Sequence, residues 1–173
     1  MSIKKLTKLL NKFKIKEVYF GGEGFQLVSI DELHSAQIGY SIQPDGTDLE
    51  GDWKKEWVVI GNDPILDDPY FVDTNQASLP VYTAMHGAGA WNPNKVSGSL
   101  QNFLECLRYL KSVSPVDDLR ITPDESTITD EEELTKMENK LTKICGESYF
   151  WSYFFKNHKQ WLEDCGVRRY HSR

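Results

Sequence analysis

Hydrophobic and polar positions alternate in three short runs near the middle of the chain, which predicts β-structure there. These runs are rich in β-branched and aromatic residues and are bounded by Asn, Asp, Pro and Gly. They are "EWVVIGN" (56–62), "PYFVDT" (69–74) and "LPVYTAM" (79–85). Because the links between them are brief, we expect adjacent antiparallel strands of one sheet rather than βαβ units. Upstream, "EVYFGGEGFQLVSI" (17–30) predicts two more strands joined by a glycine turn.

Elsewhere, apolar residues recur at spacings of three and four, which is typical of amphipathic helices. The predicted helices are a basic one within 1–16, a short one within 29–41, one over 96–113, one after a capping box at Thr129 and Glu132, and one over 147–166. The sum is an α+β fold, with a small antiparallel sheet flanked by helices. Residues 1–113 are expected to form the α+β domain. Residues 114–173 would be a linker and a C-terminal helical extension packed on the same domain.

The last predicted helix is unusually aromatic, with six aromatic residues in the seven positions 149–155. One helix face cannot hold six such side chains. The helix is therefore expected either to be sandwiched within the fold or to offer a hydrophobic surface to another chain, including a second copy.

Length and composition narrow the class of protein. The chain has 173 residues, 39% of them hydrophobic, which fits a single soluble domain. No apolar stretch approaches the roughly 18 residues of a membrane span. The basic start lacks the apolar block and cleavage site of a secretory signal. The three cysteines are odd in number and show no CxxC spacing, so neither a disulfide framework nor a zinc site is predicted. We expect a cytoplasmic protein that does not enter membranes.

Charge is unevenly distributed along the chain, whose formal net charge is −6. A net acidic chain is a poor direct ligand for nucleic acid and a better one for a basic protein. An acidic stretch directly precedes a tryptophan, and we predict that it binds the partner; the candidate residues are Asp45, Asp48, Glu50, Asp52 and Trp53. The alternatives are that the acids form an ordinary solvated face and that Trp53 folds back to cap the edge of the sheet.

Residues 67–91 bring a histidine, glycines and acids together, as catalytic loops often do. However, the motifs and partner residues that catalysis or metal binding would require are missing from the sequence. The chain has no G-x-S-x-G elbow, P-loop, Rossmann or kinase signature, and His86 has no ligand at helical spacing. No catalytic residue, metal or cofactor is predicted, and His86 is expected to be structural. A hydrolase remains an alternative if His86 meets the nearby aspartates in space.

The same region resembles the Smi/Knr-type domains of the SUKH superfamily over residues 17–111. The similarity consists of a W-x-x-I/V-G strand, an acid-rich "DPxFxD" strand, a "PVY" strand ending near His-Gly, a tryptophan, and an S-x-x-x-F-L helix. These are Trp57–Gly61, Asp68–Asp73, Pro80–Tyr82, His86-Gly87, Trp91, and Ser99 with Phe103-Leu104. The chain departs from the family pattern at its start, where a longer helix and an "LPxxY" segment are usual.

The resemblance implies a protein that binds other proteins and performs no catalysis. Bacterial members are commonly immunity proteins that neutralise a cognate toxin, often a nuclease, whereas fungal relatives regulate cell-wall synthesis as interaction hubs. We therefore expect an immunity protein with a basic toxin domain as its partner. The alternatives are a regulatory scaffold and an uncharacterised hydrolase.

Overall fold

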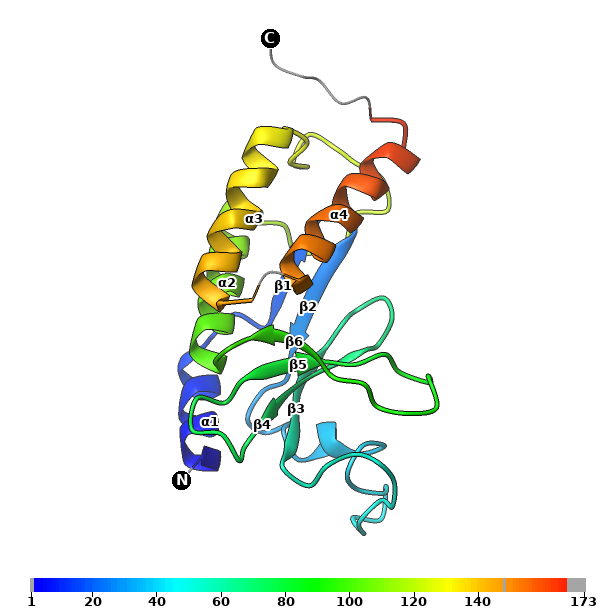
Figure 1. The fold of residues 1–173 in the computed structure, drawn as a ribbon. Coiled ribbons are helices and arrows are strands. Elements are labelled where there is room, and N and C mark those ends of the chain that lie inside the picture. Colours follow the sequence, from blue (N-terminus) through cyan, green and yellow to red (C-terminus); the bar gives the residue numbers. More distant parts are fainter. Residues whose placement is uncertain (1, 148, 168–173) are drawn as a thin grey trace.

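An antiparallel sheet with helices packed on one face forms the centre of the molecule (Figure 1). The computed structural model describes residues 2–147 and 149–167. The strands are β1 (Glu17–Phe20), β2 (Glu23–Leu27), β3 (Trp57–Asn62), β4 (Pro69–Asp73), β5 (Val81–Thr83) and β6 (Asn94–Ser97). The helices are α1 (Ser2–Lys12), the 3₁₀ turn η1 (Ser35–Gln37), α2 (Leu100–Val113), α3 (Glu131–Cys145) and α4 (Tyr149–Asp164). The fold is therefore α+β, as predicted.

The strands follow one another through the sheet in chain order, and each pairs antiparallel with the next. This confirms both the β1–β2 hairpin and the adjacency of β3, β4 and β5. Strand β6 was not predicted, because residues 94–95 were left outside any element and the following helix was expected to begin at residue 96. That helix begins instead at Leu100, after Ser99, whose hydroxyl accepts a hydrogen bond from the Asn102 backbone nitrogen at 3.1 Å.

The two faces of the sheet bury different clusters, because successive side chains of a strand point to opposite faces. On β3, Val58 and Ile60 face the main core, whereas Trp57 and Val59 face a smaller one. All four α-helices contribute to the main core, and α3 packs against both α2 and α4 (Figure 1). Loops cover the smaller cluster. The segment after residue 113 thus shares the main core; its last residues, 168–173, lie outside the described residues.

Two further predicted helix starts were wrong. Within 29–41, Ser29 and Glu32 make the reciprocal hydrogen bonds of a capping box, yet only η1 follows. The side-chain amide of Gln37 instead pairs with β3: it donates to the Val59 carbonyl and accepts from the Val59 nitrogen, both at 2.9 Å. The fold thus uses this segment to cover the edge of β3. Helix α3 is capped by Asp130, one residue after the predicted Thr129, and ends at Gly146 as expected.

The fold brings two cysteines together that are distant in sequence. Cys106 on α2 is buried, and its sulfur lies 2.6 Å from that of Cys145 on α3. The hydrogen bond to Cys145, together with burial, raises the pKa of the Cys106 thiol. A raised pKa keeps Cys106 protonated and unreactive, so this thiol serves as core packing.

Candidate functional site

The predicted acidic segment forms a solvent-exposed loop, which we call the acidic loop (residues 43–52). Its first acid is held locally: Asp45 accepts hydrogen bonds from the Thr47 hydroxyl at 2.6 Å and nitrogen at 2.9 Å, and these bonds lower the pKa of its carboxyl. Asp48 and Glu50 form no ion pair within the described part of the chain. Asp52 accepts from the backbone nitrogen of Trp91 at 2.7 Å. Negative charge in the loop is therefore accessible and largely unneutralised.

Trp53, placed in the predicted binding surface, is buried with only 8% of its area exposed. Its indole nitrogen donates to the Trp57 carbonyl at 3.1 Å, and its ring contacts Phe71 with a centroid distance of 4.8 Å. The alternative position, folded back on the sheet, is therefore the one observed. The reason is local. The link between Trp53 and β3 is short, so the indole lies over the apolar face of the sheet, where its nitrogen can donate to a backbone carbonyl. Trp53 anchors the acidic loop instead of presenting an exposed contact.

His86 lies in an exposed loop after β5, where its ring stacks on Trp91 at a centroid distance of 5.9 Å. Asp68 does approach His86, but its carboxylate accepts a hydrogen bond from the backbone nitrogen at 2.6 Å. Asp73, at the other end of β4, caps a turn by accepting from the Asn75 nitrogen. Among the described residues, no group of three His, Cys, Asp or Glu side chains is placed to hold a metal ion. The contacts made by these aspartates are those of turn-forming residues.

A feature that was not predicted is a cavity of about 370 Å³ between the sheet and α4, which we call the acidic pocket. Its walls come from the first residue of β2, the loops after β3 and β5, strands β4 to β6, and one side of α4. The lining residues are Glu23, Asp63, Leu66, Asp68, Tyr70, Thr83, Ala84, Met85, Asn94, Tyr149, Phe150, Tyr153, Phe154 and Asn157. Three lining residues are acids and none is basic.

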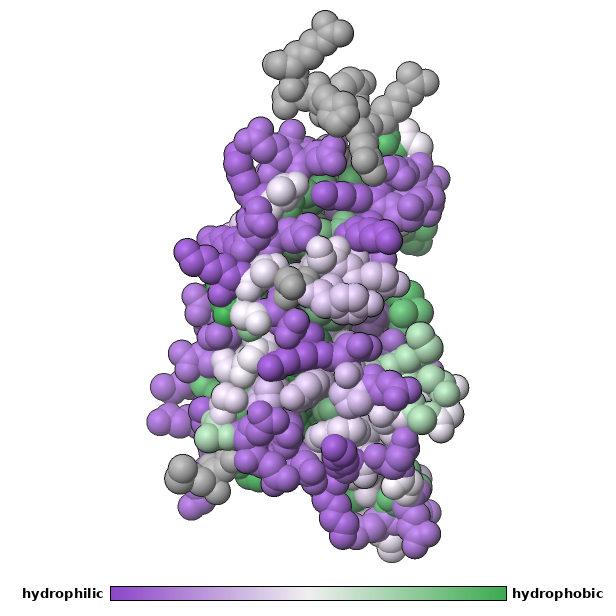
Figure 2. Space-filling model, viewed as in Figure 1, coloured by the Kyte–Doolittle hydropathy of each residue, from purple (hydrophilic) through white to green (hydrophobic). Residues whose placement is uncertain are grey.

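Hydrophobic side chains border the acidic pocket. Leu66 and Met85 are both about two-thirds exposed, at 66% and 67%. Figure 2 shows hydrophobic residues at the right-hand margin, where the loops after β3 and β5 lie in Figure 1. Across the pocket, α4 buries one set of its aromatic residues and exposes Tyr149 and Tyr153 at 71% and 56%. One face of α4 is thus sandwiched within the fold and the other is exposed; that another chain binds the exposed face stays a prediction.

The electrostatics of the acidic pocket centre on Glu23. Burial, and then the nearby Asp63 carboxylate, raise the pKa of Glu23 to about 7. Burial also raises the pKa of the Tyr70 hydroxyl, reinforced by Asp63, Glu23 and Asp68. Within the described residues, none of these three carboxylates forms an ion pair with a lysine or arginine. The pocket therefore concentrates negative charge that the fold itself leaves uncompensated.

The raised pKa of Glu23 makes stability depend on pH in a defined direction. A carboxyl whose pKa is higher in the folded state stabilises the fold below pH 4.5, and this contribution is lost as the pH rises through about 7. We expect Glu23→Gln to remove this loss. The free energy of unfolding of the variant, taken relative to that of the wild type, should therefore be about 2 kcal/mol higher at pH 8 than at pH 4.5. Urea unfolding of both proteins at the two pH values measures the difference. Parallel pH profiles would show that Glu23 titrates normally.

The sequence contained a partial signal for the acidic pocket. The surplus of aromatic residues on α4 allowed for an open surface, but no pattern marked the acids in the loop after β3 as part of a pocket. Asp63 does form a turn, because its carboxylate accepts from the nitrogens of Ile65 and Leu66. Glu23 and Asn157 are separated by most of the chain, and no local pattern could place them in one wall.

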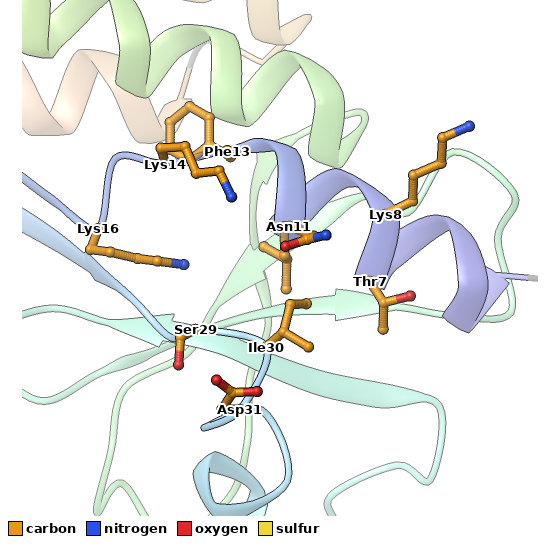
Figure 3. A pocket seen from close by; sticks show the side chains of 10 residues that line it. Thr7, Lys8, Asn11, Phe13, Lys14, Lys16, Ser29, Ile30 and Asp31 are labelled. Carbon is orange, nitrogen blue, oxygen red and sulfur yellow. The ribbon is translucent and has the colours of Figure 1, made fainter.

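A second hollow has the opposite charge. A groove of about 570 Å³ runs between the end of α1 and the segment after β2. Figure 3 shows Lys14 and Lys16 pointing toward this groove, whereas Lys8 points away. Lys16 donates to the Val28 carbonyl at 3.4 Å, and Asp31 also lines the groove. Because one lysine already has a backbone partner and an acid is present, the groove offers less unbalanced charge than the acidic pocket.

Among the described residues, no helix is both long and apolar enough to cross a membrane. No protein-family model matches the chain, and no curated protein or solved structure shows significant similarity to it.

Proposed function

We propose that the chain is a non-catalytic protein-binding module that neutralises a cognate basic toxin, in the manner of an immunity protein. The observation that supports this proposal most strongly is the presence of two acidic surfaces, the acidic loop and the acidic pocket, whose carboxylates form no ion pair within the described residues. The resemblance to SUKH domains points in the same direction.

Each acidic surface has the character of a binding site for a positively charged protein. Exposed carboxylates speed the encounter with a basic partner, whereas well-packed aromatic and apolar contacts slow its dissociation. The acidic loop supplies the first property, since its acids are exposed to solvent and form no ion pair within the described residues. The acidic pocket adds the second, since Tyr149, Tyr153, Leu66 and Met85 expose apolar area beside its carboxylates. Aromatic residues in such positions commonly dominate the binding energy of protein interfaces.

Gene context and growth rescue test the proposal. An immunity protein is expected to be encoded next to a large secreted protein that ends in a toxin domain. Expression of that toxin domain alone should arrest growth, and co-expression of this chain should restore it. An isolated reading frame, or a toxin that still kills when this chain is present, would contradict the proposal; the isolated frame would favour the regulatory scaffold.

Charge reversal within the acidic loop then tests the role of this surface. We expect Asp48→Lys with Glu50→Lys to reduce rescue while leaving the melting temperature nearly unchanged, because both side chains are exposed and unpaired. The matched control is Glu105→Lys with Glu125→Lys, which makes the same change in net charge at exposed positions outside both acidic surfaces. Equal loss of rescue in the two double variants would show that only net charge matters.

A further inference from the structure

We infer that the acidic pocket is the receptor for an arginine side chain of the partner protein. This inference rests on the proposed function, which it deepens by naming the chemical group that is recognised. The carboxylates of Glu23, Asp63 and Asp68 reach the pocket from two separate segments of the chain, the start of β2 and the loop between β3 and β4. No lysine or arginine of the described part of the chain forms an ion pair with them.

The innermost polar group of the pocket also lacks a partner. Tyr70 lines the pocket with only 4% of its area exposed, and its hydroxyl takes part in no hydrogen bond within residues 2–147 and 149–167. Buried hydroxyl groups in folded proteins are nearly always hydrogen-bonded. A hydroxyl without a hydrogen bond, beside carboxylates that have hydrogen-bond donors of the chain but no cationic partner, indicates that a cationic donor from outside the chain completes the site.

The chemistry of the walls favours arginine as that donor. A guanidinium carries five N–H donors in a planar fork, so it can bond to several carboxylates at once. It is also more weakly hydrated than an ammonium and stacks on aromatic faces. The exposed rings of Tyr149 and Tyr153 offer such faces at the mouth of the pocket, and the volume of about 370 Å³ accommodates a side chain of this size.

The test uses the full-length chain and three small probes followed by NMR. We expect N-acetyl-arginine methylamide to shift the resonances of Tyr70 and Tyr153 saturably, with a dissociation constant on the order of 1 mM. The citrulline analogue has the same shape without the charge and should bind at least tenfold more weakly; the lysine analogue should also be weaker. Equal binding of the citrulline analogue, or preference for lysine, would overturn the inference.

Variants locate the site. Tyr153→Ala should weaken arginine binding at least threefold, whereas Gln160→Ala, exposed on the same helix and absent from the pocket wall, should not change it. Glu23→Gln should weaken binding and remove the expected increase in affinity from pH 6 to 8. The other polar or titratable groups that face Glu23 are Asp63, Asp68, Tyr70, Tyr149, Tyr153 and Asn157. Unchanged affinity in both Tyr153→Ala and Glu23→Gln would place arginine elsewhere.

These outcomes separate the inference from the proposed function. If the toxin is neutralised equally well by Tyr153→Ala and Glu23→Gln, the function stands and the arginine pocket fails. If the arginine probe binds in the pocket but no toxin is neutralised, the pocket stands and the proposed function fails.

Discussion

Gly61→Ala is expected to destabilise the protein by about 3 kcal/mol, at the upper end for added atoms in a packed interior. Gly61 lies in β3 between Leu27 of β2 and Tyr70 of β4, beside a register shift in the β3–β4 pairing. A Cβ placed there would be 2.2 Å from the Gln26 carbonyl oxygen. Because that atom belongs to the backbone of a neighbouring strand, it cannot move aside without breaking the β2–β3 pairing.

Thermal unfolding measures this effect, with an expected fall in melting temperature on the order of 10 °C for a domain of this size. Gly51→Ala is the matched control. Gly51 lies in the exposed acidic loop, a Cβ there would meet nothing within 4 Å, and its φ is not positive. That variant should stay within about 0.5 kcal/mol of the wild type. Equal stability of the two alanine variants would contradict the close approach of β2 and β3.

Trp151→Ala is expected to destabilise the protein by about 4 kcal/mol or more, as large-to-small changes of buried aromatic residues do. Trp151 is fully buried, and its indole nitrogen donates to the Val96 carbonyl at 3.2 Å. Its ring also contacts Phe25 and Phe154, with centroids 6.0 and 5.7 Å away. Truncation would therefore open a cavity and leave a carbonyl of β6 without its partner.

Tyr149→Ala provides the control for this prediction on the same helix. Tyr149 is 71% exposed, so its truncation should change the free energy of unfolding by about 0.5 kcal/mol or less. Urea unfolding of both variants distinguishes the buried face of α4 from its open face. Similar small effects in both would mean that α4 is not part of the main core, and the acidic pocket would then lose one of its walls.

The sequence predicted those parts of the fold that depend on local patterns. Period-two alternation located β3, β4 and β5, and short links correctly implied their pairing. Strand β6 was not predicted because the segment "NPNKVSG" contains a single apolar residue, Val96. The strand is defined by its backbone pairing with β5. Within 29–41, Ser29 and Glu32 do form a capping box, but the pairing of Gln37 with β3 outweighed the weak local preference for helix.

The candidate site was less predictable, because it depends on contacts between distant segments. The exposed acids at 45, 48, 50 and 52 were identified from composition alone. The burial of Trp53 was not, since its partners Trp57 and Phe71 are reached only when the loop closes on the sheet. The acidic pocket requires Glu23, Asp63 and Tyr153 to meet across the fold. Sequence spacing contains no information about such an arrangement.

The association rate between this chain and the toxin domain proposed as its partner is the most direct measurement of binding to a basic protein. Stopped-flow mixing at about 50 and 500 mM salt should show a rate that falls at least tenfold as salt screens the acidic surfaces. Asp48→Lys with Glu50→Lys should slow association at low salt and leave dissociation nearly unchanged. Absence of a complex, or an association rate that depends on neither salt nor these two charges, would contradict recognition of a basic protein through the acidic loop.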